Sequence, residues 1–202
     1  MYRPVLVTPP VINPVTRAEV KAQLDISYTE KDTLIDGLIA AATTHLDGWT
    51  GILGQALCEQ TWRQDYDSVS LHCMRLPLFP VISITSVKYK DENGVEQTID
   101  PANYSLQTDD LSSYVQFIST YDLPTLYTEL PRASATYKAG YADAGSSPNF
   151  TSTVPDAIKQ AMLLLVRHWF DNPTAVNVGN IVSPMPFAVD ALLAPFRRIQ
   201  VC

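Results

Sequence analysis

The spacing of apolar residues along this chain changes twice, and this change restricts the fold more than any other feature. Apolar residues recur every three or four positions from 29 to 49 and again from 153 to 170, as in amphipathic helices. Between about 55 and 141 they alternate with polar residues, as in half-buried strands. Neither helical part can bury its apolar stripe alone, so we expect the two to pack together. The sequence predicts an α+β fold: a small bundle of N- and C-terminal helices with an inserted antiparallel β-domain.

The segment "VTRAEVKAQL" predicts the first helix. Thr16 is a suitable N-cap and Glu19 stands three residues later, which is the spacing of a capping box. Val15 and Val20 occupy the positions of a hydrophobic staple. We expect this helix to end near Asp25.

The segment "TEKDTLIDGLIAAATTHLDGW" predicts a second, longer helix. Thr29 with Asp32 can cap its start, and Gly48 and Gly51 can end it. His45 lies at the edge of the apolar stripe, and we interpret it as a half-buried structural histidine because no second metal ligand accompanies it. The stripe comprises Leu34, Ile35, Leu38, Ile39, Ala42, Leu46 and Trp49.

The middle of the chain predicts several short strands. In "VISITSVKYKDENGVEQTI", Asn93-Gly94 favours a tight type I′ hairpin turn. "YSLQTDDLSSYVQFIS" predicts two more strands around a polar turn, and "RASATYKAGYA" alternates strictly. The segment "ADAGSSPNFTST" predicts a loop.

The segment "TVPDAIKQAMLLLVRHWF" predicts a third helix, with Thr153 and Asp156 as a capping box and Pro173 as its end. Trp169 continues the apolar stripe and is expected in the core. Arg167 precedes Asp171 by four residues, which favours an ion pair on the helix surface. We therefore interpret this segment as a buried helix, not as a catalytic site.

Charge and hydropathy exclude several classes of protein. The net charge is −7, and no basic run exceeds Arg197-Arg198, whereas a phosphate-binding groove needs clustered cations. No apolar run approaches the roughly 20 residues of a membrane span, and the N-terminus does not resemble a signal peptide. The three cysteines show no metal-binding spacing, so we expect them to be free thiols and expect no metal. We also expect no cofactor and no membrane partner.

The sequence contains no recognisable catalytic constellation. It lacks GxSxG, GxxxxGK[ST], GxGxxG and HExxH motifs. His72 and Cys73 are adjacent, so on a strand they would point to opposite faces. The paired acids Asp91-Glu92 and Asp109-Asp110 lie in turn-like surroundings and are expected to be solvated. We do not expect an enzyme.

Seven segments, in order, resemble the head–tail adaptor proteins, or connectors, of long-tailed phages and gene transfer agents. The resemblance is closest to the longer members that carry a β-insert, and it covers most of the chain. The matching segments are "PVTRAEVKAQLDI", "DTLIDGLIAAATTHLDGWTG", "ALCEQTW", "LPLFPVISITSVKYKDENGVEQTIDPANYSL", "ATYKAGYA", "VPDAIKQAMLLLVRHWFDN" and "MPFAVDALLAPFRR".

The resemblance implies a structural role in a virion. Such adaptors form a ring, usually of twelve subunits, below the portal protein. They join the portal to a neck, stopper or tail-terminator protein, and DNA passes through the ring only as cargo. The expected location is the head–tail interface, and the host cytoplasm during assembly. The alternatives are a DNA-packaging or DNA-binding accessory protein, which would need a basic stripe, and an enzyme of the tail apparatus, which would need a cleft of catalytic side chains.

The resemblance and the patterns together predict five segments. They are an extended N-terminal arm at 1–15, a helical core at 16–54 and 153–186, a β-insert at 55–152 and a C-terminal portal-docking tail at 187–202. The arm is either disordered or lies along a neighbouring subunit, and the tail either docks on the portal or packs on its own core. The residues expected to bind the portal are Phe187, Leu192, Leu193, Pro195, Phe196, Arg197 and Arg198.

Overall fold

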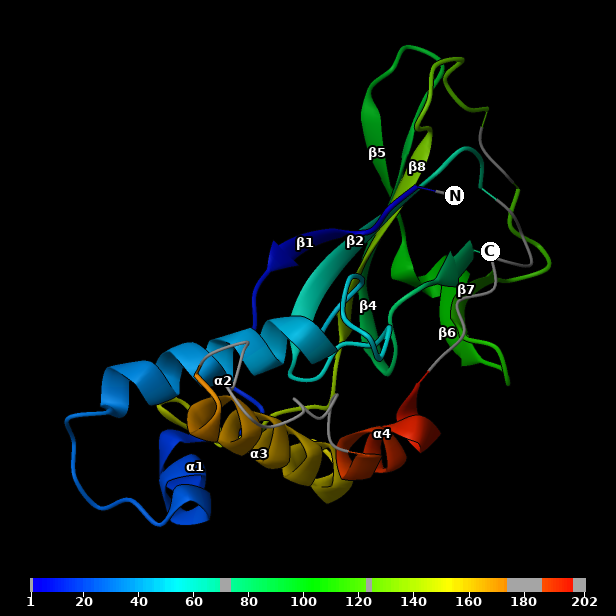
Figure 1. The fold of residues 1–202 in the computed structure, drawn as a ribbon. Coiled ribbons are helices and arrows are strands. Elements are labelled where there is room, and N and C mark those ends of the chain that lie inside the picture. Colours follow the sequence, from blue (N-terminus) through cyan, green and yellow to red (C-terminus); the bar gives the residue numbers. More distant parts are fainter. Residues whose placement is uncertain (1, 70–73, 123–124, 174–186, 198–202) are drawn as a thin grey trace. The chain divides into compact units, whose positions relative to one another are not determined.

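The computed structural model describes residues 2–69, 74–122, 125–173 and 187–197. These residues form two compact units, each discontinuous in sequence (Figure 1). The β unit lies within Met1–Val11 and Glu59–Ala142, and the helical unit within Ile12–Cys58 and Asp143–Arg198. The expected α+β fold class, with helices before and after an antiparallel β region, is confirmed.

The division of the chain differs in detail from the expected segments. The N-terminal residues up to Val11 belong to the β unit, where Val5–Thr8 form a strand. The helical unit takes in residues 55–58 and 143–152, which the sequence had assigned to the insert. The physical reason is pairing: Val5–Thr8 align with a strand of the β unit, a contact that a local pattern does not reveal.

The helical unit is built around its third helix. α3 packs against each of the other three helices, so the two sequence-distant helical parts do share one core (Figure 1). The fully or nearly fully buried residues of this core include Val20, Ile35, Ile39, Leu46, Ile158, Met162, Leu165, Val189 and Leu193. The helices are α1 (Arg17–Leu24), α2 (Asp32–Leu46), α3 (Asp156–Asp171) and α4 (Phe187–Leu193), followed by the 3₁₀ turn η2 (Ala194–Phe196).

The start of α1 is as the sequence predicts. Thr16 Oγ1 accepts a hydrogen bond from the Glu19 N–H at 3.2 Å, and Glu19 Oε2 accepts one from the Thr16 N–H at 2.6 Å. Val15 and Val20 are both buried, as expected for the staple. The helix ends at Asp25, which has φ of 59° and donates its N–H back to the last turn.

The apolar stripe of α2 is narrower than predicted. Ile35, Ile39 and Leu46 are buried, but Leu34 is 47% exposed. Successive helical residues point about 100° apart, so burying Ile35 turns Leu34 toward solvent. The predicted Thr29 cap is wrong: Lys31 is the N-cap residue and makes no side-chain cap hydrogen bond.

Two glycines of the helical unit are expected to respond oppositely to alanine. A Cβ on Gly37, inside α2, would meet nothing within 4 Å, so Gly37→Ala should raise the free energy of unfolding by about 0.5–1 kcal/mol. A Cβ on Gly51 would lie 2.4 Å from backbone atoms of Leu46 and Asp47, so Gly51→Ala should lower it by about 1–3 kcal/mol. Urea unfolding followed by circular dichroism measures both changes in the free energy of unfolding. A destabilised Gly37→Ala variant would contradict the open space around Gly37 inside α2.

α3 ends where the sequence predicts, at Asp171, two residues before Pro173. Its predicted capping box is wrong, because Pro155 is the N-cap residue and the helix start has no side-chain cap hydrogen bond. The preceding segment is also not a plain loop. β9 (Ala144–Ser146) and β10 (Asn149–Thr151) form a short hairpin. The alternation of apolar and polar residues does not predict it, because each strand has only three residues.

The β unit contains two antiparallel sheets. The larger has the strand order β1-β2-β8-β4-β5, and the smaller has the order β3-β7-β6. The larger sheet comprises β1 (Val5–Thr8), β2 (Gln60–Tyr66), β8 (Ala133–Ala139), β4 (Val81–Lys90) and β5 (Glu96–Ile99). The smaller comprises β3 (Met74–Leu76), β7 (Ser113–Phe117) and β6 (Tyr104–Thr108), which follows the 3₁₀ turn η1 (Pro101–Asn103).

The buried faces of the two sheets share one core. On β8, Ala133, Ala135, Tyr137 and Ala139 are buried in strict alternation, as the sequence predicts. Tyr137 Oη accepts a hydrogen bond from the Leu78 N–H, and the phenol of Tyr66 on β2 donates to the Arg75 carbonyl on β3 at 2.6 Å. Burial raises the pKa of Tyr137, so its hydroxyl stays protonated.

The β4–β5 hairpin forms, but its turn is not type I′. Gly94 has φ of 78°, whereas Asp25 is the sole non-glycine residue with positive φ in the described ranges, so Asn93 does not. The Asp91 carboxylate accepts hydrogen bonds from the N–H groups of Asn93 and Val95, each at 3.0 Å. This gives a three-residue loop with glycine in the left-handed position. A hydrogen bond from Gln97, aided by these N–H groups, lowers the pKa of Asp91.

Candidate docking surfaces

The C-terminal element consists of α4 and η2, and one side of it belongs to the core of the helical unit. Val189 and Leu193 are fully buried where α4 packs on α3. The side chain of the buried Gln55 donates a hydrogen bond to the Phe196 carbonyl at 3.2 Å. The element is therefore anchored to its own unit through apolar contacts and a long-range hydrogen bond.

The other side of this element faces solvent and carries several of the residues expected to bind the portal. Phe187 is 87% exposed, which leaves a whole aromatic ring without burial. Arg197 forms an ion pair with Asp190 at 2.5 Å. Among the expected residues, Pro195 and Arg197 are exposed, Leu192 and Phe196 are half-buried, Leu193 is buried, and Arg198 lies outside the described residues.

The burial of Leu193 separates the expected residues into two groups. A side chain that is fully enclosed by its own unit cannot also contact another protein without unfolding of α4. The available docking surface is therefore Phe187, Leu192, Pro195, Phe196 and Arg197, which we call the C-terminal surface.

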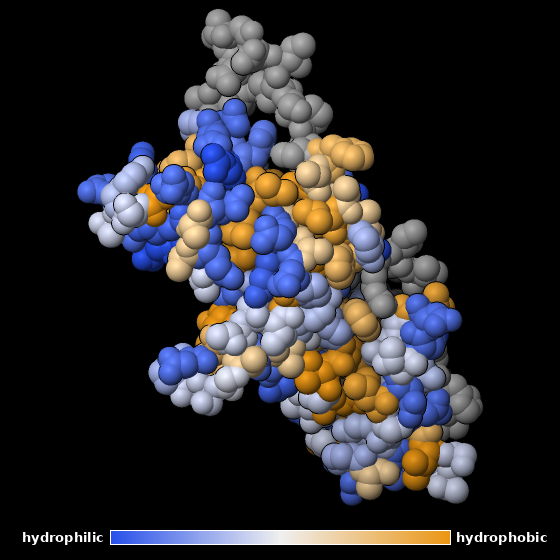
Figure 2. Space-filling view, turned by 90° about the horizontal axis from the view of Figure 1, so that it is seen from below, coloured by the Kyte–Doolittle hydropathy of each residue, from blue (hydrophilic) through white to orange (hydrophobic). Residues whose placement is uncertain are grey.

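Exposed apolar side chains occur elsewhere too, as the orange areas on the face in Figure 2 illustrate. In the helical unit, Tyr28, Leu34 and Ile52 are large hydrophobic residues with exposed side chains. In the β unit, every residue of the edge strand β1 is exposed, including Val5, Leu6 and Val7. An edge strand without internal charge or proline is open to further pairing.

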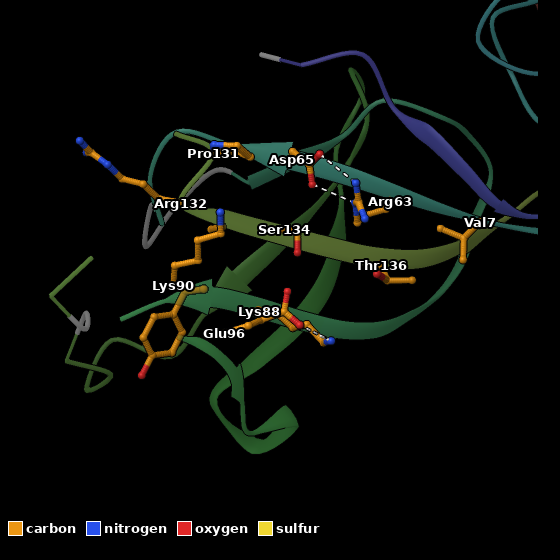
Figure 3. Close-up of a pocket in the computed structure, with 12 residues that line it drawn as sticks. Val7, Arg63, Asp65, Lys88, Lys90, Glu96, Pro131, Arg132, Ser134 and Thr136 are labelled. Atoms are coloured by element: carbon orange, nitrogen blue, oxygen red, sulfur yellow. Dashed lines mark hydrogen bonds and ion pairs between the residues drawn. The ribbon is translucent and has the colours of Figure 1, made fainter. Parts of the chain in front are cut away.

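The outer face of the larger sheet contains a polar pocket of about 400 Å³ (Figure 3). Its floor is β8, with Ser134 between an Arg63–Asp65 ion pair on one side and a Lys88–Glu96 ion pair on the other. The two ion pairs have distances of 3.0 Å and 2.6 Å. The remaining lining residues include Val7, Lys90, Arg132 and Thr136.

The pocket is locally cationic although its unit is acidic. The β unit within Met1–Val11 and Glu59–Ala142 contains 7 Lys and Arg residues and 11 Asp and Glu residues. Of these, 4 of the basic residues but only 2 of the acidic residues line the pocket. Lys90 forms no ion pair with any described residue. Arg132 donates to the Thr128 carbonyl, and its Nε is buried without a partner in the described part of the chain. Sequence reasoning missed this site, although alternation along β4 puts Lys88 and Lys90 on one face.

The conspicuous residues of α3 have structural roles. Arg167 pairs with Asp171 at 3.3 Å, as predicted, and also donates to the Gln23 carbonyl at 2.7 Å, which ties α3 to the end of α1. Trp169 is only half-buried and not a core residue; its ring meets that of His45 edge-on at 6.2 Å. His45 is half-buried, as predicted.

The described residues offer little for covalent or metal chemistry. Burial raises the pKa of the Cys58 thiol to about 12, which suppresses the reactive thiolate. Across 2–69, 74–122, 125–173 and 187–197, no three His, Cys, Asp or Glu side chains gather as a metal site would require. His72 and Cys73 lie outside the described residues. No helix that the structure describes has the length and apolar character needed to cross a bilayer.

A family model described as "Head completion protein" matches residues 15–198. The chain belongs to the head completion protein family. The family match confirms the resemblance to head–tail adaptors that was inferred from the seven sequence segments. Comparison with curated proteins gives no match.

The fold of this head completion protein is similar to that of chains from gene transfer agent (GTA) particles. A chain from "Neck of empty GTA particle computed with C6 symmetry" superposes with a TM-score of 0.75 at 22% identity, covering 100% of this chain and 98% of that one. A chain from "Virion of native gene transfer agent (GTA) particle" gives 0.70 at 21%, with the same coverages. A chain from "Neck of native GTA particle computed with C12 symmetry" gives 0.62 at 20%, covering 98% of each. At these identities the likeness establishes the fold.

Proposed function

We propose that this head completion protein forms a ring at the head–tail junction of a tailed phage or phage-like particle. In this position it joins the portal to the next neck, stopper or tail-terminator protein, and DNA passes through the ring. It acts as a structural part of the virion and catalyses no reaction. The observation that carries the proposal is the family match over residues 15–198.

Two further observations support the proposal. Chains of the same fold occur in neck structures computed with C6 and C12 symmetry, which favours a ring of twelve copies for this protein as well. The net charge of −7 suits a ring through which DNA slides, because an acidic wall does not retain phosphates.

We propose that the C-terminal surface binds the portal. The C-terminal surface includes an exposed aromatic residue and an arginine, and aromatic and Arg side chains dominate binding energy at protein interfaces. Phe187 supplies the ring, and Arg197 can exchange Asp190 for an acidic residue of the portal.

Portal binding is tested with surface substitutions, because deleting residues 187–202 would also remove the buried Val189 and Leu193. Phe187→Ala combined with Arg197→Ala is expected to weaken binding to purified portal rings by about tenfold or more. Leu34→Ala is the matched control, since Leu34 is an exposed apolar residue of the same unit but lies on α2. Interferometry gives the affinities, and negative-stain images show whether portal rings carry a second ring. Wild-type affinity in the double variant would remove the C-terminal surface from the proposal. A wild-type chain that never decorates the portal would overturn the proposed function.

A further inference from the structure

We propose that Gln55 is a positioning residue for portal binding: its buried side chain holds the 3₁₀ turn η2, so that the C-terminal surface presents Phe196 and Arg197 in one fixed orientation. This inference rests on the proposed function of the C-terminal surface. It adds a residue that lies outside that surface and is separated from Phe196 by 141 positions in the sequence. Gln55 itself is only 2% exposed, so it acts through η2 and not by contact with the portal.

The turn η2 needs an anchor because its own contacts are weak. The Arg197 N–H reaches the Ala194 carbonyl at 3.4 Å, which is long for a hydrogen bond. The Arg197–Asp190 ion pair lies at the surface with both side chains nearly half exposed, so it contributes little stability. Within residues 187–197, the last fully buried side chain is that of Leu193, which directly precedes η2.

The side chain of Gln55 supplies the anchor. Its amide N–H donates a hydrogen bond to the Phe196 carbonyl at 3.2 Å, at the last residue of η2. Because the glutamine side chain is buried, its amide cannot replace this partner by bulk water without a cost in free energy. The bond therefore fixes the backbone at the point where η2 ends and Arg197 begins.

The backbone around Gln55 is itself held in place. Gln55 lies in the segment that follows α2, and residues 53–58 of this segment are all buried. The Gln55 carbonyl accepts a hydrogen bond from the Gly48 N–H at 2.8 Å, and the Asp47 carboxylate accepts one from the Leu57 N–H at 2.6 Å. These bonds tie the residues on both sides of Gln55 to the end of α2, so the glutamine side chain extends from a fixed backbone.

This arrangement orders part of the C-terminal surface before the portal arrives. Interface residues that are already held in their bound orientation lose less conformational entropy on docking than mobile ones. Without the Gln55 bond, the same side chains would still be present, but part of the binding energy would be spent on ordering η2. Substitution of Gln55 should therefore weaken portal binding although no contact with the portal is lost.

The test compares Gln55→Met with Gln64→Met. Methionine keeps the length of the side chain but cannot donate, so Gln55→Met is expected to weaken binding to purified portal rings by about three- to tenfold, the equivalent of one hydrogen bond. Gln64 is the matched control, because it is also a buried glutamine whose amide donates to a distant backbone carbonyl, that of Tyr2 at 2.8 Å, but it belongs to the β unit. Gln64→Met is expected to leave portal affinity unchanged. Interferometry gives the affinities, and urea unfolding shows whether the two variants lose similar stability.

A double-mutant cycle separates positioning from a general loss of stability. If Gln55 acts through η2, its effect on portal affinity should shrink in the Arg197→Ala background, because the side chain that η2 presents is then already gone. The effect should persist in the Phe187→Ala background, since Phe187 lies at the first residue of α4. Hydrogen exchange followed by mass spectrometry adds a direct readout. In Gln55→Met, peptides covering 194–197 should exchange faster, whereas peptides from α3 should keep wild-type protection.

Each result supports or overturns the positioning role. Wild-type portal affinity in Gln55→Met, together with weak binding of the combined Phe187→Ala and Arg197→Ala variant, would overturn it and leave the portal-binding surface intact. Equal losses of affinity in Gln55→Met and Gln64→Met would also overturn it, because lost stability would then be the cause. Wild-type affinity in the combined surface variant, or no portal binding by the wild-type chain, would remove the C-terminal surface and this inference together. Should Gln55→Met fail to fold, Gln55→Asn takes its place with the same expected results, because its amide stops one methylene group short of the Phe196 carbonyl.

Discussion

Replacing Leu193 by alanine is expected to lower the free energy of unfolding by about 2–5 kcal/mol. Leu193 is fully buried at the end of α4, where α4 packs on α3, so its truncation leaves a cavity in the core of the helical unit. Urea unfolding followed by circular dichroism measures the change. This substitution decides whether the C-terminal element is part of the fold or a detachable arm.

Phe187→Ala is the matched control for Leu193→Ala. Phe187 belongs to the same helix but is 87% exposed, so its truncation should change the free energy of unfolding by no more than about 0.5 kcal/mol. Equal effects of the two substitutions would contradict the packing of α4 described above. Unchanged stability in both would mean that α4 is not docked in solution.

Replacing Tyr137 by alanine is expected to cost about 3–5 kcal/mol, the usual range for removing a buried aromatic ring. Tyr137 is fully buried on β8, and its hydroxyl accepts the Leu78 N–H at 3.4 Å. Since β8 also forms the floor of the cationic pocket, the loss should disturb that face of the larger sheet as well.

Tyr137→Phe separates packing from hydrogen bonding. It keeps the ring and removes one weak hydrogen bond, so the expected cost is about 1 kcal/mol. Thermal and urea unfolding of both variants give the comparison. If Tyr137→Phe were as damaging as Tyr137→Ala, the hydroxyl rather than the ring would hold the two sheets together.

Local patterns predicted those parts of the fold that depend on neighbouring residues. The capping box at Thr16 and Glu19 needs only a spacing of three, and the alternation of β8 needs only a period of two. The end of α3 before Pro173 follows from the missing N–H of proline. The Arg167–Asp171 pair likewise follows from helical spacing.

Local patterns gave wrong predictions where the sequence allows more than one N-cap residue or more than one type of turn. Thr29 and Thr153 have the right chemistry for N-caps, but α2 and α3 begin at other residues. The Asn93-Gly94 pair permits a type I′ turn, yet the Asp91 carboxylate stabilises a longer loop by binding the N–H groups of Asn93 and Val95. These differences are small in free energy, so packing and side-chain hydrogen bonds decide them.

The candidate surfaces, too, were predicted only in part from the sequence. The sequence predicted a portal-docking tail at 187–202, and it contained the alternation that puts Lys88 and Lys90 on one face of β4. It could not show that Leu193 is buried while Phe187 is exposed. Nor could it show that Arg63 of β2 and Arg132, which directly precedes β8, line the same pocket as Lys88 and Lys90 of β4.

The sequence by itself determined the order of helices and strands, their periods, the absence of familiar catalytic motifs and the family resemblance, because all of these are local or cumulative properties of the chain. The tertiary structure decided which side of each element is covered, that Val5–Thr8 completes a sheet with residues more than fifty positions away, and that four cations of an acidic unit gather on one face. These features arise from contacts between residues distant in sequence, and periodicity carries no information about which distant residues will meet.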